Sequence, residues 1–177
     1  SIENFSLTAG GFGVAYGDRL SSLLIVDNRP GEKKFQGATA LSITDGNFVL
    51  EGATPFSNNG TWLFSARRTY YDFVLNRLTD QDLPAFVDFQ LQAGWEFGPG
   101  HRLSLTGLRS VEDADFSKNW TGSGQRAAFQ SDVKNDLASA RFDAVLGSRS
   151  TSTTIVSWYR NQELLDFNGK IRADAKR

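Results

Sequence analysis

The chain has 177 residues, of which 40% are hydrophobic, 12% aromatic and 22% charged, with no Cys and a single His. The lack of cysteine excludes disulfides, thiolate nucleophiles and Cys-ligated metal centres, and one histidine leaves little for a His-based metal site or general base. Nineteen basic residues against twenty acidic ones give a net charge of −1, so no nucleic-acid partner held by phosphate contacts is expected.

Residues 1–30 differ in pattern from the rest of the chain. The run Gly10-Gly11-Phe12-Gly13 predicts a turn-rich, flexible element. Leu20–Val26 is apolar apart from two serines and predicts a strand buried on both faces. Arg29-Pro30-Gly31 begins a linker, so we expect one domain over 1–30 and a second over 31–177.

Strict alternation of apolar and polar residues dominates the second part. Between Phe86 and Phe97 the odd positions are apolar and the even ones are polar or Gly, with two carboxylates. This period of two is that of a β-strand, and helical spacing is missing from these segments. The pattern predicts an all-β fold, an antiparallel meander of roughly seven strands, over 34–43, 48–56, 61–71, 86–97, 102–110, 136–147 and 152–165, the last able to continue toward Arg177.

Turn residues separate these strands. Asp45-Gly46 predicts a tight hairpin at 44–47, and further short connections are predicted at 57–60, 98–101 and 147–150. Longer connections, 72–85 and 111–135, follow the third and fifth strands. Short turns at one end and long loops at the other are typical of an outer-membrane barrel. The hairpin at 44–47 departs from this pattern, because it is short but falls at the long-loop end. Aromatic residues beside two of the short turns would form its interfacial girdle: Phe56, Trp62, Trp95 and Phe97.

Such a barrel is compatible with the composition. Its strands alternate, so hydropathy averages out, as in the mean hydropathy of −0.35. The longest aliphatic run, Leu23–Val26, is far below the roughly 20 residues of a spanning helix. Because the chain has no Met and starts at Ser1, we expect a processed product or a piece of a longer protein.

Gly10-Gly11-Phe12, followed by Tyr16-Gly17-Asp18-Arg19-Leu20-Ser21-Ser22, resembles the end of the plug domain of TonB-dependent outer-membrane receptors. The resemblance continues in the first three predicted strands, with Phe35-Gln36-Gly37, Leu50-Glu51-Gly52 and Ser65-Ala66-Arg67-Arg68-Thr69-Tyr70-Tyr71-Asp72. It implies that 1–30 is the C-terminal end of a plug and that 31–177 holds the N-terminal strands of a large transmembrane barrel.

The same resemblance implies a function. It is energised uptake across the bacterial outer membrane of a large scarce solute, such as an iron chelate, a corrinoid or an oligosaccharide. The expected partners are a TonB-type energy-transducing protein, which would act through a segment absent here, the surrounding outer-membrane lipid and the transported solute. Neither cofactor nor enzymatic activity is expected.

Two groups of candidate site residues follow. The resemblance implies that Arg19 pairs with lumen carboxylates, Glu51 or Glu96, to hold the plug; the alternative is an ordinary solvated arginine. Four residues near the long-loop end form a candidate ligand vestibule, since guanidinium and phenol groups suit anionic or sugar ligands: Arg67, Arg68, Tyr70 and Tyr71. Their alternative role is a girdle tyrosine beside a lumen arginine.

The other acidic residues do not match the pattern of a metal site or of a catalytic acid–base pair. Glu112, Asp113 and Asp115 lack the ligand spacing of a calcium loop, which favours a solvated loop and no metal site. Asp80 and Asp82 have no nucleophile nearby. Two other classes of protein stay open: a soluble all-β carbohydrate- or ligand-binding module, and a plugless porin- or adhesin-type barrel.

Overall fold

The computed structural model describes residues 2–9, 22–55, 57–70, 85–115, 129–167 and 171–176. Every regular element in these residues is a β-strand. The chain divides into two compact units, Ser1–Pro30 and Gly31–Arg177. The plug-like residues Gly10, Gly11, Tyr16, Gly17 and Arg19 lie outside the described residues, as does Tyr71.

The first unit is a pair of antiparallel strands, β1 (Ile2–Ala9) and β2 (Ser22–Asn28), in register from Phe5 with Val26 to Ala9 with Ser22. The strand predicted over Leu20–Val26 corresponds to β2. β1 was not predicted, although Phe5, Leu7 and Ala9 alternate with Ser6 and Thr8 as a strand requires.

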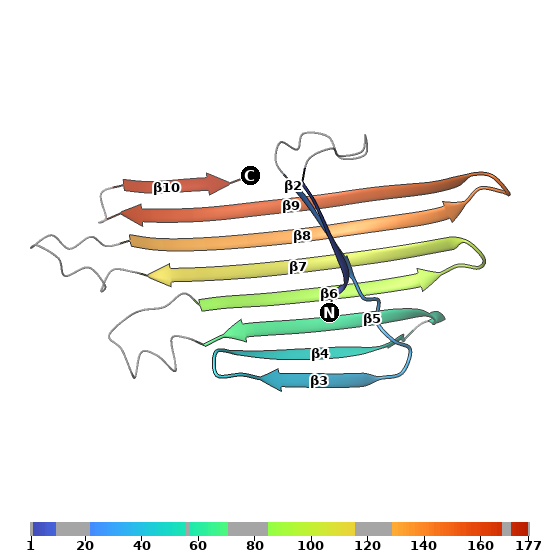
Figure 1. Cartoon of the computed structure of the whole chain (residues 1–177), viewed down its shortest axis with the longest axis horizontal. Coiled ribbons are helices and arrows are strands. Elements are labelled where there is room, and N and C mark those ends of the chain that lie inside the picture. Colours follow the sequence, from blue (N-terminus) through green and yellow to red (C-terminus); the bar gives the residue numbers. More distant parts are fainter. Residues whose placement is uncertain are drawn as a thin grey trace, which may run out of the picture. The chain divides into compact units, whose positions relative to one another are not determined.

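The second unit is one sheet of eight strands in the order β10-β9-β8-β7-β6-β5-β4-β3 (Figure 1), each strand antiparallel to its neighbour in sequence. The predicted all-β antiparallel meander is therefore confirmed. The seven predicted strands correspond to β3 to β9, and β10 is an additional strand where the seventh was expected to continue. The strands are β3 (Gln36–Leu41), β4 (Asp45–Thr54), β5 (Ser57–Thr69), β6 (Ala85–Glu96), β7 (His101–Asp115), β8 (Phe129–Val145), β9 (Thr151–Phe167) and β10 (Ile171–Lys176).

Two turn predictions held and two were wrong. Gly98 and Gly100 adopt φ of +98° and +82° between β6 and β7, and Gly147 adopts +99° between β8 and β9, a conformation that glycine adopts without strain. The hairpin predicted at 44–47 instead turns at 42–44, because the Ser42 hydroxyl accepts the N–H groups of Thr44 and Asp45 at 3.1 and 2.9 Å.

The second error concerns residues 57–60, which lie at the start of β5. A register irregularity after Ala53 shortens the connection, and the Thr54 hydroxyl donates to the Ser57 carbonyl at 2.9 Å. Gly60 is a strand residue whose missing side chain leaves room for the indole of Trp95.

β7 and β8 are also longer than predicted. Their ladder continues to the pair Asp115–Gln130, so Val111–Asp115 belongs to β7 and only 116–128 connect the two strands. Glu112 and Asp113 consequently project to opposite faces of the sheet. The solvated loop expected at 111–115 is therefore a strand.

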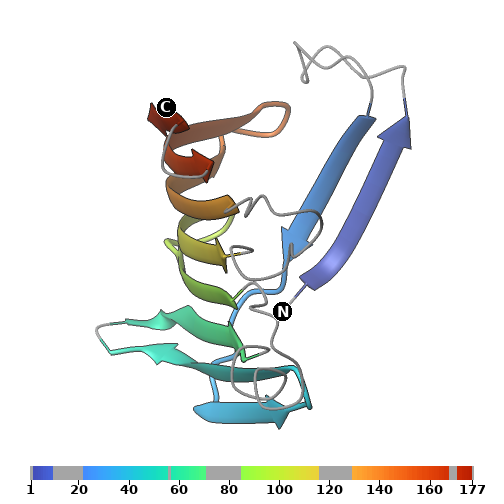
Figure 2. The ribbon, with the colours of Figure 1, turned by 90° about the vertical axis from the view of Figure 1, so that its left-hand side faces the viewer.

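The sheet is a single layer that twists from β3 to β10 (Figure 2) and is open, with β3 and β10 at its edges. Paired residues of antiparallel strands share a face, so the register defines two faces. We call one the apolar face; it carries Phe48, Phe64, Phe89, Leu91, Leu105, Phe142, Val156 and Trp158. The opposite, polar face carries Glu51, Ser65, Asp88, Gln90, Ser110, Ser139, Arg141 and Ser157.

A conventional core is missing from the described residues, in which the only buried hydrophobic side chains are Leu63, Ala114 and Ala144. Most large apolar side chains are instead exposed, among them Val156 at 68% and Trp158 at 53%. None of the described segments is a helix with the length and apolarity needed to span a bilayer.

Candidate functional site

The segment Gly31–Phe35, which leads into β3, crosses the sheet over β4 and β5. The Ala53 N–H donates to the Lys33 carbonyl at 3.1 Å. Gly31 lies directly against the backbone of Trp62 and Leu63, so closely that a Cβ atom at this position would overlap the Trp62 carbonyl. Leu63, which has no exposed surface, and Glu51, which binds the backbone of Glu32, both project to the polar face, so Gly31 and Glu32 lie over that face.

Glu51 fastens this segment to the sheet. The residue is 4% exposed, and its carboxylate accepts the backbone N–H of Glu32 at 2.9 Å and the side-chain amide of Gln36 at 3.0 Å. Burial of a carboxylate is costly unless its oxygens are hydrogen-bonded. The carboxylate predicted to receive Arg19 is thus bound to the chain just before β3, and Arg19 itself lies outside the described residues.

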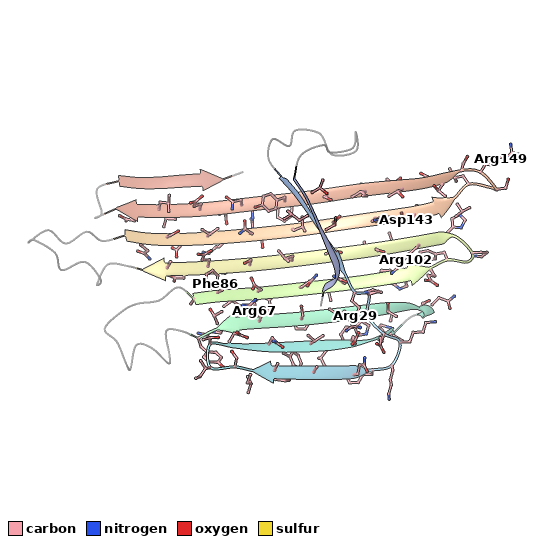
Figure 3. All side chains as sticks on the ribbon, viewed as in Figure 1. Arg29, Arg67, Phe86, Arg102, Asp143 and Arg149 are labelled. Carbon is pink, nitrogen blue, oxygen red and sulfur yellow. The ribbon has the colours of Figure 1, made fainter. Side chains whose placement is uncertain are left out.

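Glu96 is exposed at the end of β6, opposite Arg102 of β7. In the next strands Asp143 accepts both Arg141, at 2.8 and 3.1 Å, and the Thr153 hydroxyl, at 2.7 Å. Arg102 and Asp143 lie near the short-turn end of the sheet (Figure 3). The two acids predicted to face the plug therefore share the polar face, but at different sites along it.

The predicted ligand vestibule does not form on a single face. Arg67 and Arg68 are consecutive on β5 and so project to opposite sides: Arg67 pairs in register with Asp88 on the polar face, and Arg68 with Val87 on the apolar face. The Tyr70 hydroxyl donates to the carbonyl oxygens of the β3–β4 turn, at Ser42 and at Asp45 (3.1 Å). Tyr70 thus stabilises a turn. Of the predicted vestibule residues that the structure describes, Arg67 is the one that faces the polar side.

Hydrogen bonds run across the strands of the polar face. The hydroxyls of Ser139 and Ser157 lie 2.9 Å apart, and Asn135 accepts both the Tyr159 hydroxyl (2.8 Å) and the Asn161 amide (2.7 Å). Each of these groups retains partial contact with solvent. These groups can border water, although Leu108 (37% exposed) and Ile155 (58% exposed) lie on the same face. The exposed phenyl and isobutyl groups of the opposite face cannot border water without cost.

Two tryptophans lie on the apolar face toward the short-turn end. Trp62 donates from Nε1 to the Ala53 carbonyl at 3.0 Å, and its ring lies 6.3 Å from that of Phe35, with both rings over Gly52. Trp95 packs over Gly60. Of the other predicted girdle residues, Phe97 is 61% exposed and Phe56 lies outside the described residues.

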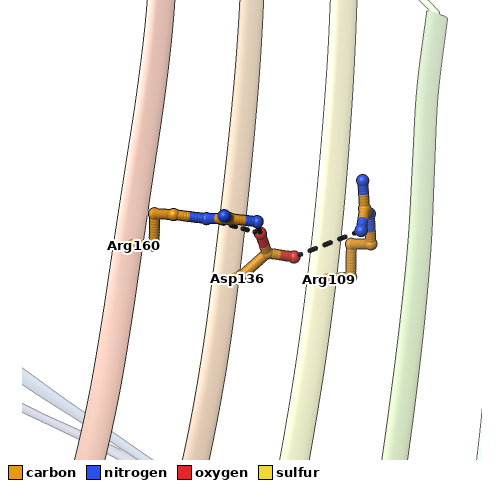
Figure 4. A network of polar contacts seen from close by, with 3 residues as sticks. All are labelled: Arg109, Asp136 and Arg160. Carbon is orange, nitrogen blue, oxygen red and sulfur yellow. Dashed lines mark hydrogen bonds and ion pairs between the residues drawn. The ribbon is translucent and has the colours of Figure 1, made fainter. Parts of the chain in front are cut away.

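One charged group on the apolar face was not predicted. Asp136 of β8 lies between Arg160 of β9, whose Nη2 and Nε approach Oδ2 at 2.5 and 3.1 Å, and Arg109 of β7, at 3.7 Å (Figure 4). Arg160 also stacks on Trp158, with 5.5 Å from its guanidinium carbon to the ring centroid. The available signal was a charge at an apolar-face position in each of three strands, which is visible only when their register is known.

In the described ranges, His, Asp and Glu do not gather in groups of three that could hold a metal ion. Comparisons of the chain with protein-family models, curated proteins and solved structures found no match. The chemically distinctive features are the exposed apolar face, the hydrogen-bonded polar face and the segment fastened to the latter.

Proposed function

We propose that residues 31–177 form part of the wall of a TonB-dependent outer-membrane receptor, with the apolar face against lipid and the polar face toward the lumen. The single observation that carries this proposal is the exposed apolar side chains that lie on one face of a one-layer antiparallel sheet. Exposed apolar patches larger than a few hundred Å² mark interaction surfaces. A lipid bilayer would cover the apolar face of this sheet.

Strand length and open edges support a membrane setting. A membrane β-strand needs roughly 9–11 residues, and β6 to β9 have 12, 15, 17 and 17. In the part of the chain that the structure describes, β3 and β10 each pair on one side only. In a bilayer their unpaired backbone groups would cost several kcal/mol each, so closure of the barrel by further strands belongs to the proposal.

The Gly31–Phe35 segment supports a plug. It reaches β3 over the polar face and is held there by Glu51. In a closed barrel this face lines the lumen, and a chain that enters β3 from the lumen is what a domain inside the barrel requires. A plugless porin or adhesin has no need for such an entry.

Transport itself is inferred from the sequence resemblance. The receptor would take up a large scarce solute, such as an iron chelate, corrinoid or oligosaccharide, and a TonB-type protein would supply the energy. The connections at 70–84 and 116–128 would contribute to solute capture at the outer surface. The lumen-facing Arg67 lies at the end of β5 that leads into the first of them.

The experiment is to express the full-length protein in a Gram-negative host, fractionate the membranes and test binding of the purified periplasmic domain of the host's TonB-type protein. We expect outer-membrane location and saturable binding. Outer-membrane location without binding would favour the plugless barrel. A monomer that is stable in buffer without detergent would favour the soluble binding module and contradict the proposal.

A further inference from the structure

A hollow of about 370 Å³ lies on the apolar face of the sheet, around Gly107 of β7. In the row that contains Gly107, the residue on one side is Leu91 and on the other Ala138, followed by Trp158. Two small residues thus separate two large ones over three strand spacings, about 14 Å. The position where a Gly107 Cβ would stand has no atom within 4 Å, so the floor is open. We call this feature the Gly107 hollow; its side-chain lining includes Phe64, Phe89, Leu91, Arg109, Asp136, Trp158 and Arg160.

Positive charge borders one end of the Gly107 hollow. Arg109 and Arg160 share the single carboxylate of Asp136, which is 14% exposed, whereas the two arginine side chains are 56% and 46% exposed. The group therefore carries one uncompensated positive charge, with N–H donors free to face outward. Lys134, the next residue of β8 on this face, lies between Asp136 and Asp132, so it is not counted toward the charge of the group.

Acidic residues lie too far away to neutralise this group. Asp113 and Asp132, paired across β7 and β8 on the same face, are four residues beyond Arg109 and Asp136. That separation is about 14 Å along the strands, several times the 3.7 Å or less that separates Asp136 from the two guanidinium groups. An anion near the guanidinium groups would therefore experience mainly their attraction.

We propose that the Gly107 hollow binds an anionic lipid, with an acyl chain between Leu91 and Trp158 and the phosphate against Arg109 and Arg160. Guanidinium groups recognise phosphate through paired N–H donors. Basic groups beside an apolar surface suit the boundary between acyl chains and headgroups. The inference rests on the proposed function, because a lipid reaches this site only if the apolar face lies in a bilayer.

The test uses the full-length protein in phosphatidylcholine vesicles that contain a minor fraction of a brominated lipid. One arm contains brominated phosphatidylglycerol and the matched arm brominated phosphatidylcholine with the same chains. Bromine quenches tryptophan fluorescence on contact, and the signal of Trp158 is the difference between the protein and its Trp158→Phe variant. We expect quenching of Trp158 to be about fivefold stronger with the anionic lipid, the effect of one uncompensated cation at a lipid surface.

Two variants and a control localise the effect. The double variant Arg109→Gln, Arg160→Gln is expected to reduce the ratio of anionic to phosphatidylcholine quenching from about five to about one, the ratio expected without a net cation. Gly107→Leu, which keeps the charges and fills the hollow, is expected to reduce the anionic quenching to the phosphatidylcholine level. The control, Arg67→Gln with Arg102→Gln, removes two other exposed cations and is expected to keep the preference.

The outcomes separate the two proposals. Equal quenching by both lipids in the unaltered protein would overturn the lipid site and leave the membrane setting intact. Absence of quenching by either lipid would overturn both. A preference that survives in both the arginine variant and Gly107→Leu would place the anionic contact elsewhere and overturn the assignment.

Discussion

The carboxylate of Glu51 accepts the backbone N–H of Glu32 at 2.9 Å, across 19 positions of sequence. The chain just before β3 is thereby held on the polar face of the sheet. In the proposed receptor this is the point where the plug would pass into the barrel. The effect of removing this interaction on stability and on hydrogen exchange can be measured without knowing the transported solute.

Glu51→Ala should leave the Glu32 N–H and the Gln36 amide without this acceptor. Loss of a partner by a buried polar group costs about 1–3 kcal/mol of unfolding free energy, and hydrogen exchange at the Glu32 amide should accelerate. Glu51→Gln, which keeps one acceptor oxygen, should lose less. The control is Glu96→Ala, since Glu96 is exposed. An exchange rate at Glu32 that is the same in Glu51→Ala as in the unaltered protein would contradict this role.

Two glycines on the apolar face should respond in opposite directions. A Cβ at Gly60 would collide with Trp95 and Thr54, so Gly60→Ala should lower the free energy of unfolding by about 1–3 kcal/mol. Gly107 has open space above it, so Gly107→Ala should be neutral or stabilise by up to about 1 kcal/mol, through the smaller entropy of the unfolded chain. Denaturant titration in detergent measures both. Equal effects would show that Trp95 does not pack on Gly60.

Tyr70→Phe removes the hydroxyl that donates to the carbonyls of the β3–β4 turn. A typical hydrogen bond contributes about 0.5–1.5 kcal/mol, and a loss of this size should accompany faster exchange of the Thr44 and Asp45 amides. If Tyr70 instead belonged to a ligand vestibule, the substitution would weaken solute binding and leave the turn unchanged. Arg67→Gln, on the opposite face, is the matched variant for solute binding.

Local signals in the sequence predict much of the sheet. Alternation in Phe86–Phe97 defines the two faces of β6, and glycines at 98, 100 and 147 mark turns because their backbones adopt positive φ. The errors occur where a distant residue decides the local structure. A glycine such as Gly60 usually indicates a turn, but here it lies in a strand and leaves room for the indole of Trp95. Asp45-Gly46 also lies in a strand, because the Ser42 hydroxyl forms the turn a few residues before it.

In the candidate site, too, the sequence indicates single residues but not the partners that distant segments supply. Glu51 is visible in the sequence as an acidic residue in a predicted strand, but its partners come from the segment that folds back over it. The group formed by Arg109, Asp136 and Arg160 requires the register of three strands, each separated from the next by a connection. A prediction from one strand at a time cannot place these residues side by side.

The central claim is that the apolar face lies in lipid and the polar face in water. Its most direct test is to place nitroxide spin labels singly at positions 89 to 93 of β6 in the full-length protein in vesicles, and to measure collisions with oxygen and with a water-soluble nickel chelate. We predict that oxygen dominates at Phe89, Leu91 and Ala93 and the chelate at Gln90 and Gln92, since successive residues face opposite sides. Access of the chelate to all five positions would contradict the account.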